Sequence, residues 1–404
     1  MGGCGRYCGI LYCEEENMRL RVPSYYKKFH CIAGACQDSC CIGWEIDIDE
    51  DTFSYYKSVE GAFGERLRAH MVTEDVNSFA LQENGWCPFL NREKLCDICI
   101  ALGEEALSEV CTEFPRFTME YEDVREKVLS LSCEEVGRLV FSTDEKITWE
   151  EHELPDDLCM EMDAWDDGEM EESDAEMDAW DDEAADVPAE QLEAVREQAL
   201  AILQNRRKPI FERAAEYLSY CKRMQQELYG GMMTAGQAQR KTERTEQELS
   251  HQAYQDFLAR MESYERLEVL DGTWEEVKRA LYDTFSEKNY RVAQQEFVET
   301  YREREYEYEH LLVYFTNRYF MRAYYDDNIL TKAQFAIVSV LMIRDMDVAR
   351  YLLGEGKYTL EDRIDTAKIY AKEVEHSEEN MELLAEDFQF EEVFCVERLL
   401  EQLA

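Results

Sequence analysis

The crowding of cysteines near the start of the chain constrains its fold more than any other feature. Four fall within eleven positions of the stretch CIAGACQDSCCIGWEIDID, residues 31 to 49, and Cys40 and Cys41 are adjacent. Random burial does not crowd thiols so closely, and a loop of small and polar residues such as GACQDSCC can fold around an ion. In a chain that stays in a reducing compartment, clustered thiols are more often metal ligands or catalysts than disulfides.

Eight thiols are candidate metal ligands: four lie close together in one loop, and four follow at larger spacings along the chain. No histidine stands at a typical zinc spacing, so ligation by thiolates alone favours an iron–sulfur cluster, with zinc in a Cys-only site as the alternative. Eight candidates exceed the four that one cluster needs, so either a second metal binds or some of them have another role. The candidates are Cys31, Cys36, Cys40, Cys41, Cys87, Cys96, Cys111 and Cys133.

The remaining cysteines are interpreted differently. Cys159, Cys221 and Cys395 are single and far apart, which is typical of ordinary buried cysteines. Three more, Cys4, Cys8 and Cys13, are either a further ligand group or part of a non-native or disordered extension over residues 1–17.

The charge of the chain excludes one class of partner. Its 404 residues contain 90 Asp and Glu against 43 Lys and Arg, a net charge of −47. Such a surface repels phosphate backbones and anionic lipid, so neither nucleic acid nor membrane is an expected partner. No apolar run has the length of a membrane span and the first residues have no secretory apolar core, which predicts a cytoplasmic protein.

The composition predicts a mainly α protein with a small cysteine-rich region at its N-terminus. We predict a mixed α+β metal-binding domain over 18–142, an acidic disordered linker over 143–190 and a helical bundle over 191–404. The linker holds the repeated EMDAWDD, which carries Trp165 and Trp180, and too few apolar residues to order itself. Apolar residues at helical spacing indicate helices from 189 onward, one of them beginning at a Thr331 cap and stopping at Gly354.

Three ordered segments resemble the flagellin lysine N-methylases of motile bacteria. They are PSYYKKFHCIAGACQDSCCIGWEIDID, CPFLNREKLCDICIALGEEALSEVCTEFPR and LSLSCEEVGRLVF, and the later EHLLVYFTNRYFMRAYYDDNILTKAQFAIVSVLMIRDMD is similar to the helical half of that family. The family carries a cysteine-rich region of the zinc- or iron-chelating CxxxCxxCC type. The eight cysteines named above match its pattern, whereas Cys99 does not.

The resemblance implies methyl transfer from S-adenosylmethionine to lysine side chains of flagellin in the cytoplasm. It also implies an iron–sulfur cluster, of the 4Fe-4S type, held by those cysteines. The alternative class is a non-enzymatic metal-binding or redox-sensing protein whose helical half binds a partner, since adjacent cysteines suit thiol redox chemistry.

The donor and lysine sites are not located by sequence. The chain lacks a Gly-rich turn after a first strand, and YGGMMTAG at 229–236 follows a helix. The radical-type C-x3-C-x2-C spacing also fails after Cys36 and Cys40, which leaves polar displacement as the simpler mechanism. Catalytic and cofactor-binding residues are therefore unknown at this stage. Four aromatic residues close to cysteines could orient an amine or a sulfonium, or be core: Tyr25, Tyr26, Trp44 and Trp86.

Overall fold

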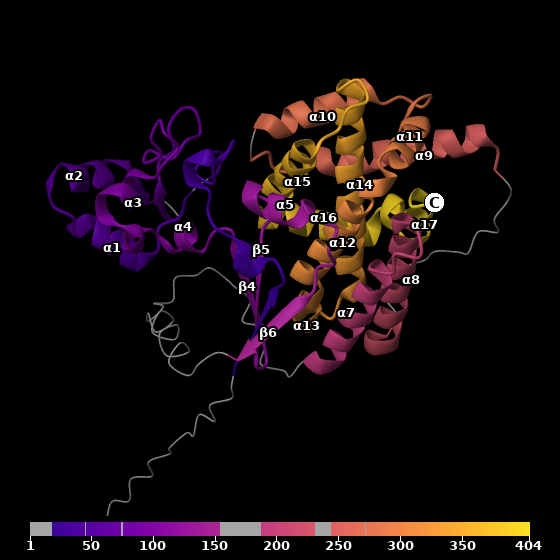
Figure 1. Ribbon diagram of the computed structural model, residues 1–404, viewed down its shortest axis with the longest axis horizontal. Helices are drawn as coiled ribbons and strands as arrows, with labels where there is room; N and C mark the ends of the chain where they lie inside the picture. Colours follow the sequence, from indigo (N-terminus) through magenta and orange to yellow (C-terminus); the bar gives the residue numbers. More distant parts are fainter. Residues whose placement is uncertain (1–17, 45, 74–75, 154–186, 231–243, 271) are drawn as a thin grey trace, which may run out of the picture.

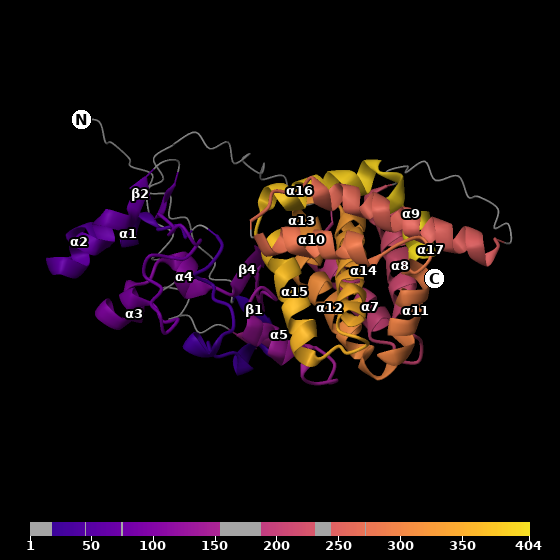
Figure 2. The ribbon, with the colours of Figure 1, turned by 90° about the horizontal axis from the view of Figure 1, so that it is seen from above.

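The computed structural model describes residues 18–44, 46–73, 76–153, 187–230, 244–270 and 272–404. The fold is mainly α, as predicted, with a small strand-containing N-terminal part. Figures 1 and 2 place a group of short helices at one end, a small sheet in the middle and the long helices at the other end. Among the described helices none is both long and apolar enough to cross a membrane.

The four-stranded sheet joins the two ends of the molecule. Its order is β4-β5-β1-β6, so the earliest strand lies between two that follow it by more than a hundred residues. Strand β1 runs parallel to β5, with Arg19 opposite Val124, and antiparallel to β6, with Pro23 opposite Trp149. The strands are β1 (Arg19–Pro23), β4 (Arg116–Tyr121), β5 (Val124–Leu129) and β6 (Trp149–Glu153).

A separate small unit, here called the cysteine module, comprises residues 31–114. It has its own hydrophobic core, built around Phe53, Tyr56, Phe79 and Phe89. Its elements are short and irregular: α1 (Glu50–Ser58), α2 (Gly61–His70), β2 (Met71–Thr73), β3 (Asn77–Phe79), α3 (Asp97–Leu102) and α4 (Glu109–Glu113). Helix α1 begins at Asp49, whose carboxylate accepts the Thr52 N–H. A turn at Asn91 places Leu90 opposite Cys96.

The long helices surround α14, which is buried along most of its length. An apolar helix of this kind can only be a central core element. Helix α5 joins this bundle and contacts α15 and α12. The helices are α5 (Glu134–Phe141), α7 (Ala189–Leu203), α8 (Ile210–Tyr229), α9 (Glu246–Glu265), α10 (Gly272–Thr284), α11 (Tyr290–Thr300), α12 (Tyr306–Tyr319), α13 (Ala323–Asp326), α14 (Ile329–Leu353), α15 (Leu360–Val374), α16 (Glu378–Phe390) and α17 (Val396–Gln402).

The structure divides the chain differently from the predicted ranges. Strand β6 and the buried Ile147 lie inside the range predicted as linker. This segment is ordered because Ile147 and Trp149 alternate with polar residues, and the strand that follows extends the sheet. The strands β4 and β5 and helix α5, predicted as part of the cysteine-rich domain, contribute side chains to the core of the long helices instead.

Two details of the helical predictions also change. The cap of α14 is Asn328, whose side chain accepts the Thr331 N–H, so Thr331 was wrongly predicted as the cap. Gly354 ends that helix as predicted. The expectations for residues 1–17, Cys159, Trp165, Trp180 and most of 229–236 lie outside the described residues.

Candidate functional site

The eight cysteines predicted as metal ligands lie in two parts of the fold. Four of them belong to the core of the cysteine module: Cys87 is buried in it, and Cys41, Cys96 and Cys111 pack against it. The Cys87 N–H donates to the Cys41 carbonyl at 2.8 Å. The backbone of Cys96 forms an antiparallel β-bridge with that of Leu90. We call Cys41, Cys87, Cys96 and Cys111 the module thiols.

The other candidates lie toward the long helices. Cys133 precedes α5 and packs on the main core, and the next residue, Glu134, accepts the Gln37 N–H at 2.8 Å. That bond brings the Cys36 loop to the start of α5. The charges of Cys31 and Cys133 contribute to raising the pKa of Cys36 to about 12, although burial is the main cause. The charges of Cys31 and Cys133 are therefore felt at Cys36.

Cys40 lies between the two sets. Its thiol is hydrogen-bonded to that of Cys41, which stabilises the Cys41 thiolate and lowers the pKa of Cys41 to about 7. The same bond, with burial and the charges of Cys41, Cys111 and Cys31, raises the pKa of Cys40. Cys40 is thus within electrostatic reach of both sets.

Several sulfur atoms accept backbone N–H groups, as sulfurs in cluster-binding loops do. The Ala33 N–H lies 3.4 Å from the sulfur of Cys31, and the Phe89 N–H lies 3.5 Å from that of Cys87. The Cys96 sulfur accepts two N–H groups from the first turn of α3, although burial still raises the pKa of Cys96. Such bonds favour the thiolate form that metal ligation requires.

The side chains are nevertheless not gathered on one point. In the described ranges no three His, Cys, Asp or Glu side chains form a group that could hold a metal ion. Cys99, excluded from the ligand set, lies on α3, and burial and the nearby Glu104 and Glu105 raise the pKa of its thiol. Cys221 is buried in the main core, as expected for an ordinary core cysteine, and Cys395 precedes α17.

A cluster of aromatic rings forms where the cysteine module meets the long helices. We call Trp44, Phe114, Phe117 and His376 the junction cluster. The His376 ring centroid lies 4.7 Å from that of Trp44, 5.6 Å from Phe117 and 6.2 Å from Phe114. Trp44 follows the Cys40–Cys41 pair and donates its indole N–H to the Cys40 carbonyl at 2.7 Å, so the cluster and the thiols share one loop.

Local sequence explains the position of His376. Helix α15 ends at Val374, and the Ser377 side chain caps α16 by accepting the Asn380 N–H, so His376 lies in the corner between two helices. Its Nε2 atom lies 2.8 Å from Ser132 Oγ, and Ser130 Oγ lies 2.8 Å from Ser132 Oγ. These serines connect β5 to α5, and they hold the imidazole ring in place.

A buried carboxylate lies behind the cluster. Glu375 Oε2 accepts hydrogen bonds from Tyr314 at 2.9 Å and Tyr319 at 2.6 Å, and lies 3.1 Å from Arg318 Nε. Burial raises the pKa of Glu375, and Arg318 opposes that shift. The Arg318 guanidinium also lies 3.4 Å from the centroid of Phe117, which links this network to the cluster.

Two lysines attach the cysteine loop to α15. Lys368 and Lys372 place their ammonium groups 3.6 and 3.5 Å from the carboxylate of Asp38, and both side chains are nearly buried. The Lys372 ammonium also lies 5.0 Å from the centroid of Trp44. Burial, Arg318 and Lys372 together lower the pKa of His376 to about 3, so the imidazole is neutral near pH 7.

The comparisons with known proteins fit this arrangement. Residues 196–402, half of the chain, match the family described as the FliB lysine N-methylase C-terminal domain. The chain belongs to the FliB lysine N-methylase family. That match covers the long helices from α7 to α17, including Arg318, Lys372 and His376.

Individual relatives support the family assignment. The chain is 32% identical to a lysine-N-methylase of Salmonella choleraesuis over 128 residues and 31% identical to that of Salmonella typhimurium over the same length. It is 31% identical over 134 residues to the flagellar biosynthetic protein FliU of Salmonella muenchen, of which 76% is covered. Each match covers 30% of this chain, and the first two span only 32% of those relatives' length. No solved structure matches.

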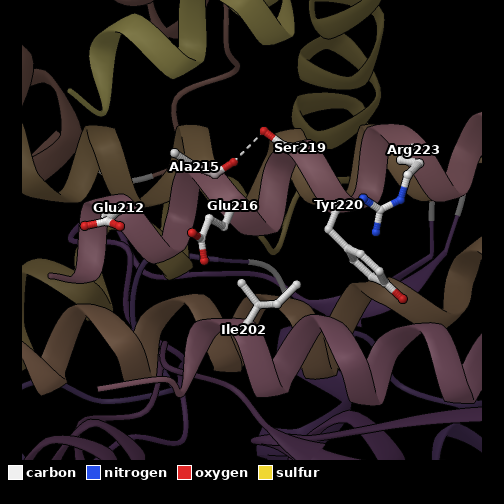
Figure 3. A pocket seen from close by; sticks show the side chains of 7 residues that line it. All are labelled: Ile202, Glu212, Ala215, Glu216, Ser219, Tyr220 and Arg223. Carbon is white, nitrogen blue, oxygen red and sulfur yellow. Dashed lines mark hydrogen bonds between the residues drawn. The ribbon is translucent and has the colours of Figure 1, made fainter. Parts of the chain in front are cut away.

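A hollow between α7 and α8 lacks the residue types of the thiol and junction sites. Figure 3 shows a space of about 450 Å³ between α7 and α8, with Ile202 facing Glu212, Glu216 and Tyr220. Ser219 donates its hydroxyl to the Ala215 carbonyl at 2.8 Å, and Glu216 is paired with Lys208. The seven lining side chains include no cysteine or histidine, and the hollow is remote in sequence from the thiols.

Only part of the junction cluster was predicted from the sequence. Trp44 was expected as an aromatic candidate and belongs to the cluster, and Tyr25 is buried in the main core near Arg318 and Glu375. Trp86 packs on the module core, and Tyr26 lies near Arg116. His376, Phe114, Phe117 and Ser132 were missed, because only the folded chain brings these distant segments together.

Proposed function

We propose that the protein is a lysine N-methyltransferase that transfers methyl groups from S-adenosylmethionine to lysine side chains of flagellin in the cytoplasm. The match of residues 196–402 to the lysine N-methylase C-terminal domain carries this proposal. The relative described as a flagellar biosynthetic protein supports flagellin as the partner. The junction cluster supplies aromatic faces suited to cationic groups such as a sulfonium or an ammonium.

We further propose that the module thiols hold an iron–sulfur cluster of the 4Fe-4S type, with zinc as the alternative. Four thiols that share one small core, some with N–H groups directed at their sulfurs, match the donor set of such a cluster. When bound, the cluster would add redox-active iron and cross-link four segments of the module. Cys31, Cys36, Cys40 and Cys133 are then left for a second metal or for a supporting role.

The residues of the chain have one chemical task in this reaction. Lysine must lose a proton before it can act as a nucleophile, since its free pKa is about 10.4. A desolvated site beside other cations favours the neutral amine. The corner around His376 has both properties, because burial and two neighbouring cations already keep the imidazole neutral.

The test is anaerobic co-expression with flagellin from the same genome, followed by intact-protein and peptide mass spectrometry. We expect methylated lysines with the wild type and none with the Cys41→Ser, Cys87→Ser double variant. The matched control is Cys99→Ser, which changes a cysteine outside the ligand set. Unmodified flagellin from a preparation with its full iron and sulfide would overturn the enzymatic proposal and favour a redox module based on the hydrogen-bonded Cys40–Cys41 pair.

A further inference from the structure

The junction cluster has the features of a receptor for one particular side chain. We infer that it receives the lysine to be methylated, and that the Nδ1 atom of His376 accepts a hydrogen bond from the neutral amine of that lysine. This inference rests on the proposed function and deepens it, because it assigns the acceptor site of the reaction.

One ring nitrogen of His376 is available. Nε2 is bonded to Ser132 at 2.8 Å and lies 3.4 Å from Ser130 Oγ. Among the described residues Nδ1 has no hydrogen-bond partner, and it is not one of the buried unpartnered atoms. The ring is only partly buried. A fixed imidazole with one solvent-accessible nitrogen can accept a hydrogen bond from an entering ligand.

The two serines are compatible with the tautomer of His376 in which Nδ1 carries no proton. If the Ser132 hydroxyl accepts from Nε2–H, Nδ1 is the unprotonated nitrogen and therefore the acceptor. Ser132 can in turn donate to Ser130, because the two hydroxyl oxygens lie 2.8 Å apart. Ser130 and Ser132 are both buried, so this chain of hydrogen bonds is shielded from competing water.

The walls around this nitrogen suit the stem of a lysine. Trp44, Phe114 and Phe117 are each partly buried, and their rings lie within 6.2 Å of the imidazole by centroid. Trp44 already faces the ammonium of Lys372, at 5.0 Å, which shows that a lysine head group fits against this ring. Apolar rings bind the methylene stem, and their faces also tolerate the cationic methylated product.

The charges around His376 keep an entering amine unprotonated. Arg318 on α12 and Lys372 on α15 are the cations that disfavour protonation of the imidazole. Glu375 pairs with Arg318, and Asp38 pairs with Lys372. An entering ammonium would meet the same desolvation and the same cations, so it loses its proton to bulk water more readily than in solution.

The reaction then balances without a further co-reactant. The acceptor Lys–NH3⁺ releases one proton to water on entering the site, and the resulting amine donates one N–H to His376 Nδ1. The nitrogen lone pair attacks the methyl carbon of the sulfonium donor, an N–C bond forms, and the S–C bond breaks with its electron pair left on sulfur. The product is a monomethyl-ammonium side chain and a neutral thioether.

Steady-state kinetics on the full chain with flagellin tests the role of His376. We expect His376→Leu to lower kcat about 100-fold with little change in KM, as for a group that positions the nucleophile. His376→Gln keeps an acceptor and should recover most of that loss. The control is His251→Leu, an exposed histidine on α9 paired with Glu287. Equal kcat values for the His376→Leu and His251→Leu variants, at equal iron content and circular dichroism, would overturn the inference.

A second readout does not depend on turnover. A flagellin peptide with a ¹³C-methyl group on its lysine amine is titrated by NMR, free and in the presence of the protein. We expect the bound amine to titrate at lower pH than the free one, and Lys372→Met to reverse part of that shift. An unchanged amine pKa in the saturated complex would contradict the site. If the amine titrates low but the wild type never methylates flagellin, the proposed function fails while the lysine site stands.

Discussion

The cysteine module and the long-helix bundle are stabilised in different ways. The module core contains eleven buried residues, one of them a cysteine, and its helices have ten residues or fewer. The bundle surrounds a central helix of 25 residues and buries whole ion pairs. A core as small as that of the module rarely stabilises a fold without metal ions or disulfides, whereas the bundle needs neither.

Removal of the proposed metal ligands should have the largest effect on the difference between the module and the bundle. If the module thiols hold the proposed cluster, Cys87→Ser, Cys111→Ser should lose bound iron and become susceptible to proteolysis within residues 46–111, because metal cross-links contribute on the order of 10 kcal/mol to small metal domains. The bundle should keep its cooperative thermal transition. Limited proteolysis with mass spectrometry separates the two parts. A module that stays resistant without metal would show that its core suffices, and Cys99→Ser is the matched control.

A buried charge in the bundle should have the next largest effect. Asp347 on α14 is fully buried, contacts Arg363 at 2.5 Å and accepts the Tyr308 and Tyr358 hydroxyls. Asp347→Asn leaves a buried guanidinium short of one partner, which typically costs about 3–5 kcal/mol. Urea denaturation followed by circular dichroism measures the change, with the exposed Glu299→Gln as control. Equal midpoints for the two variants would show that the pair does not stabilise the bundle.

Acid should weaken the bundle before its carboxylates titrate. Burial lowers the pKa of His310, whose Nδ1 lies 2.7 Å from the Val140 carbonyl, and that of His376 falls to about 3. Since both folded values lie below the unfolded value of about 6.5, the stability they give is complete above that pH and is lost as pH falls below it.

The free energy of unfolding should therefore decline from pH 7 to pH 5. The measurement is a series of urea titrations across that range. His310→Gln should flatten part of the slope, whereas the exposed His251→Gln should leave it unchanged. A wild type with constant stability between pH 7 and pH 5 would mean that neither histidine is effectively buried.

The contact between the two parts should show the smallest effect. Asp38→Asn removes one acidic partner of Lys368 and of Lys372, and we expect a loss of about 1 kcal/mol or less because Asp38 is partly exposed. Hydrogen exchange should increase around residues 36–44 but not in α14. An increase in both places would mean that the module and the bundle unfold as one unit.

The sequence predicts one of these parts better than the other. Helix periodicity gives the helices of the bundle, because each helix satisfies its own backbone. It misses the side chain that caps α14. Strand β6 lies in an acidic stretch, and its only local signal is the alternation of Ile147 and Trp149 with polar residues.

The site is less accessible to such reasoning. Spacing identifies eight cysteines as a set, but their division depends on where Cys133 packs, and that is decided by α5 joining the bundle. Trp44 and His376 are separated by more than three hundred residues, and no local pattern links them. Buried partners such as Arg363 and Asp347 look like ordinary surface charges on their helices until the neighbouring helices are in place.

The position of β1 has a consequence for how the chain assembles. Its hydrogen-bonding partners, β5 and β6, are synthesised more than a hundred residues later, and everything between them forms one closed loop. During synthesis β1 has no strand to pair with until β5 and β6 have been made, by which time the segment from Cys31 to Cys111 has left the ribosome. Closing so long a loop is entropically unfavourable. The segment that carries the thiols is therefore complete before β1 can pair with β5 and β6.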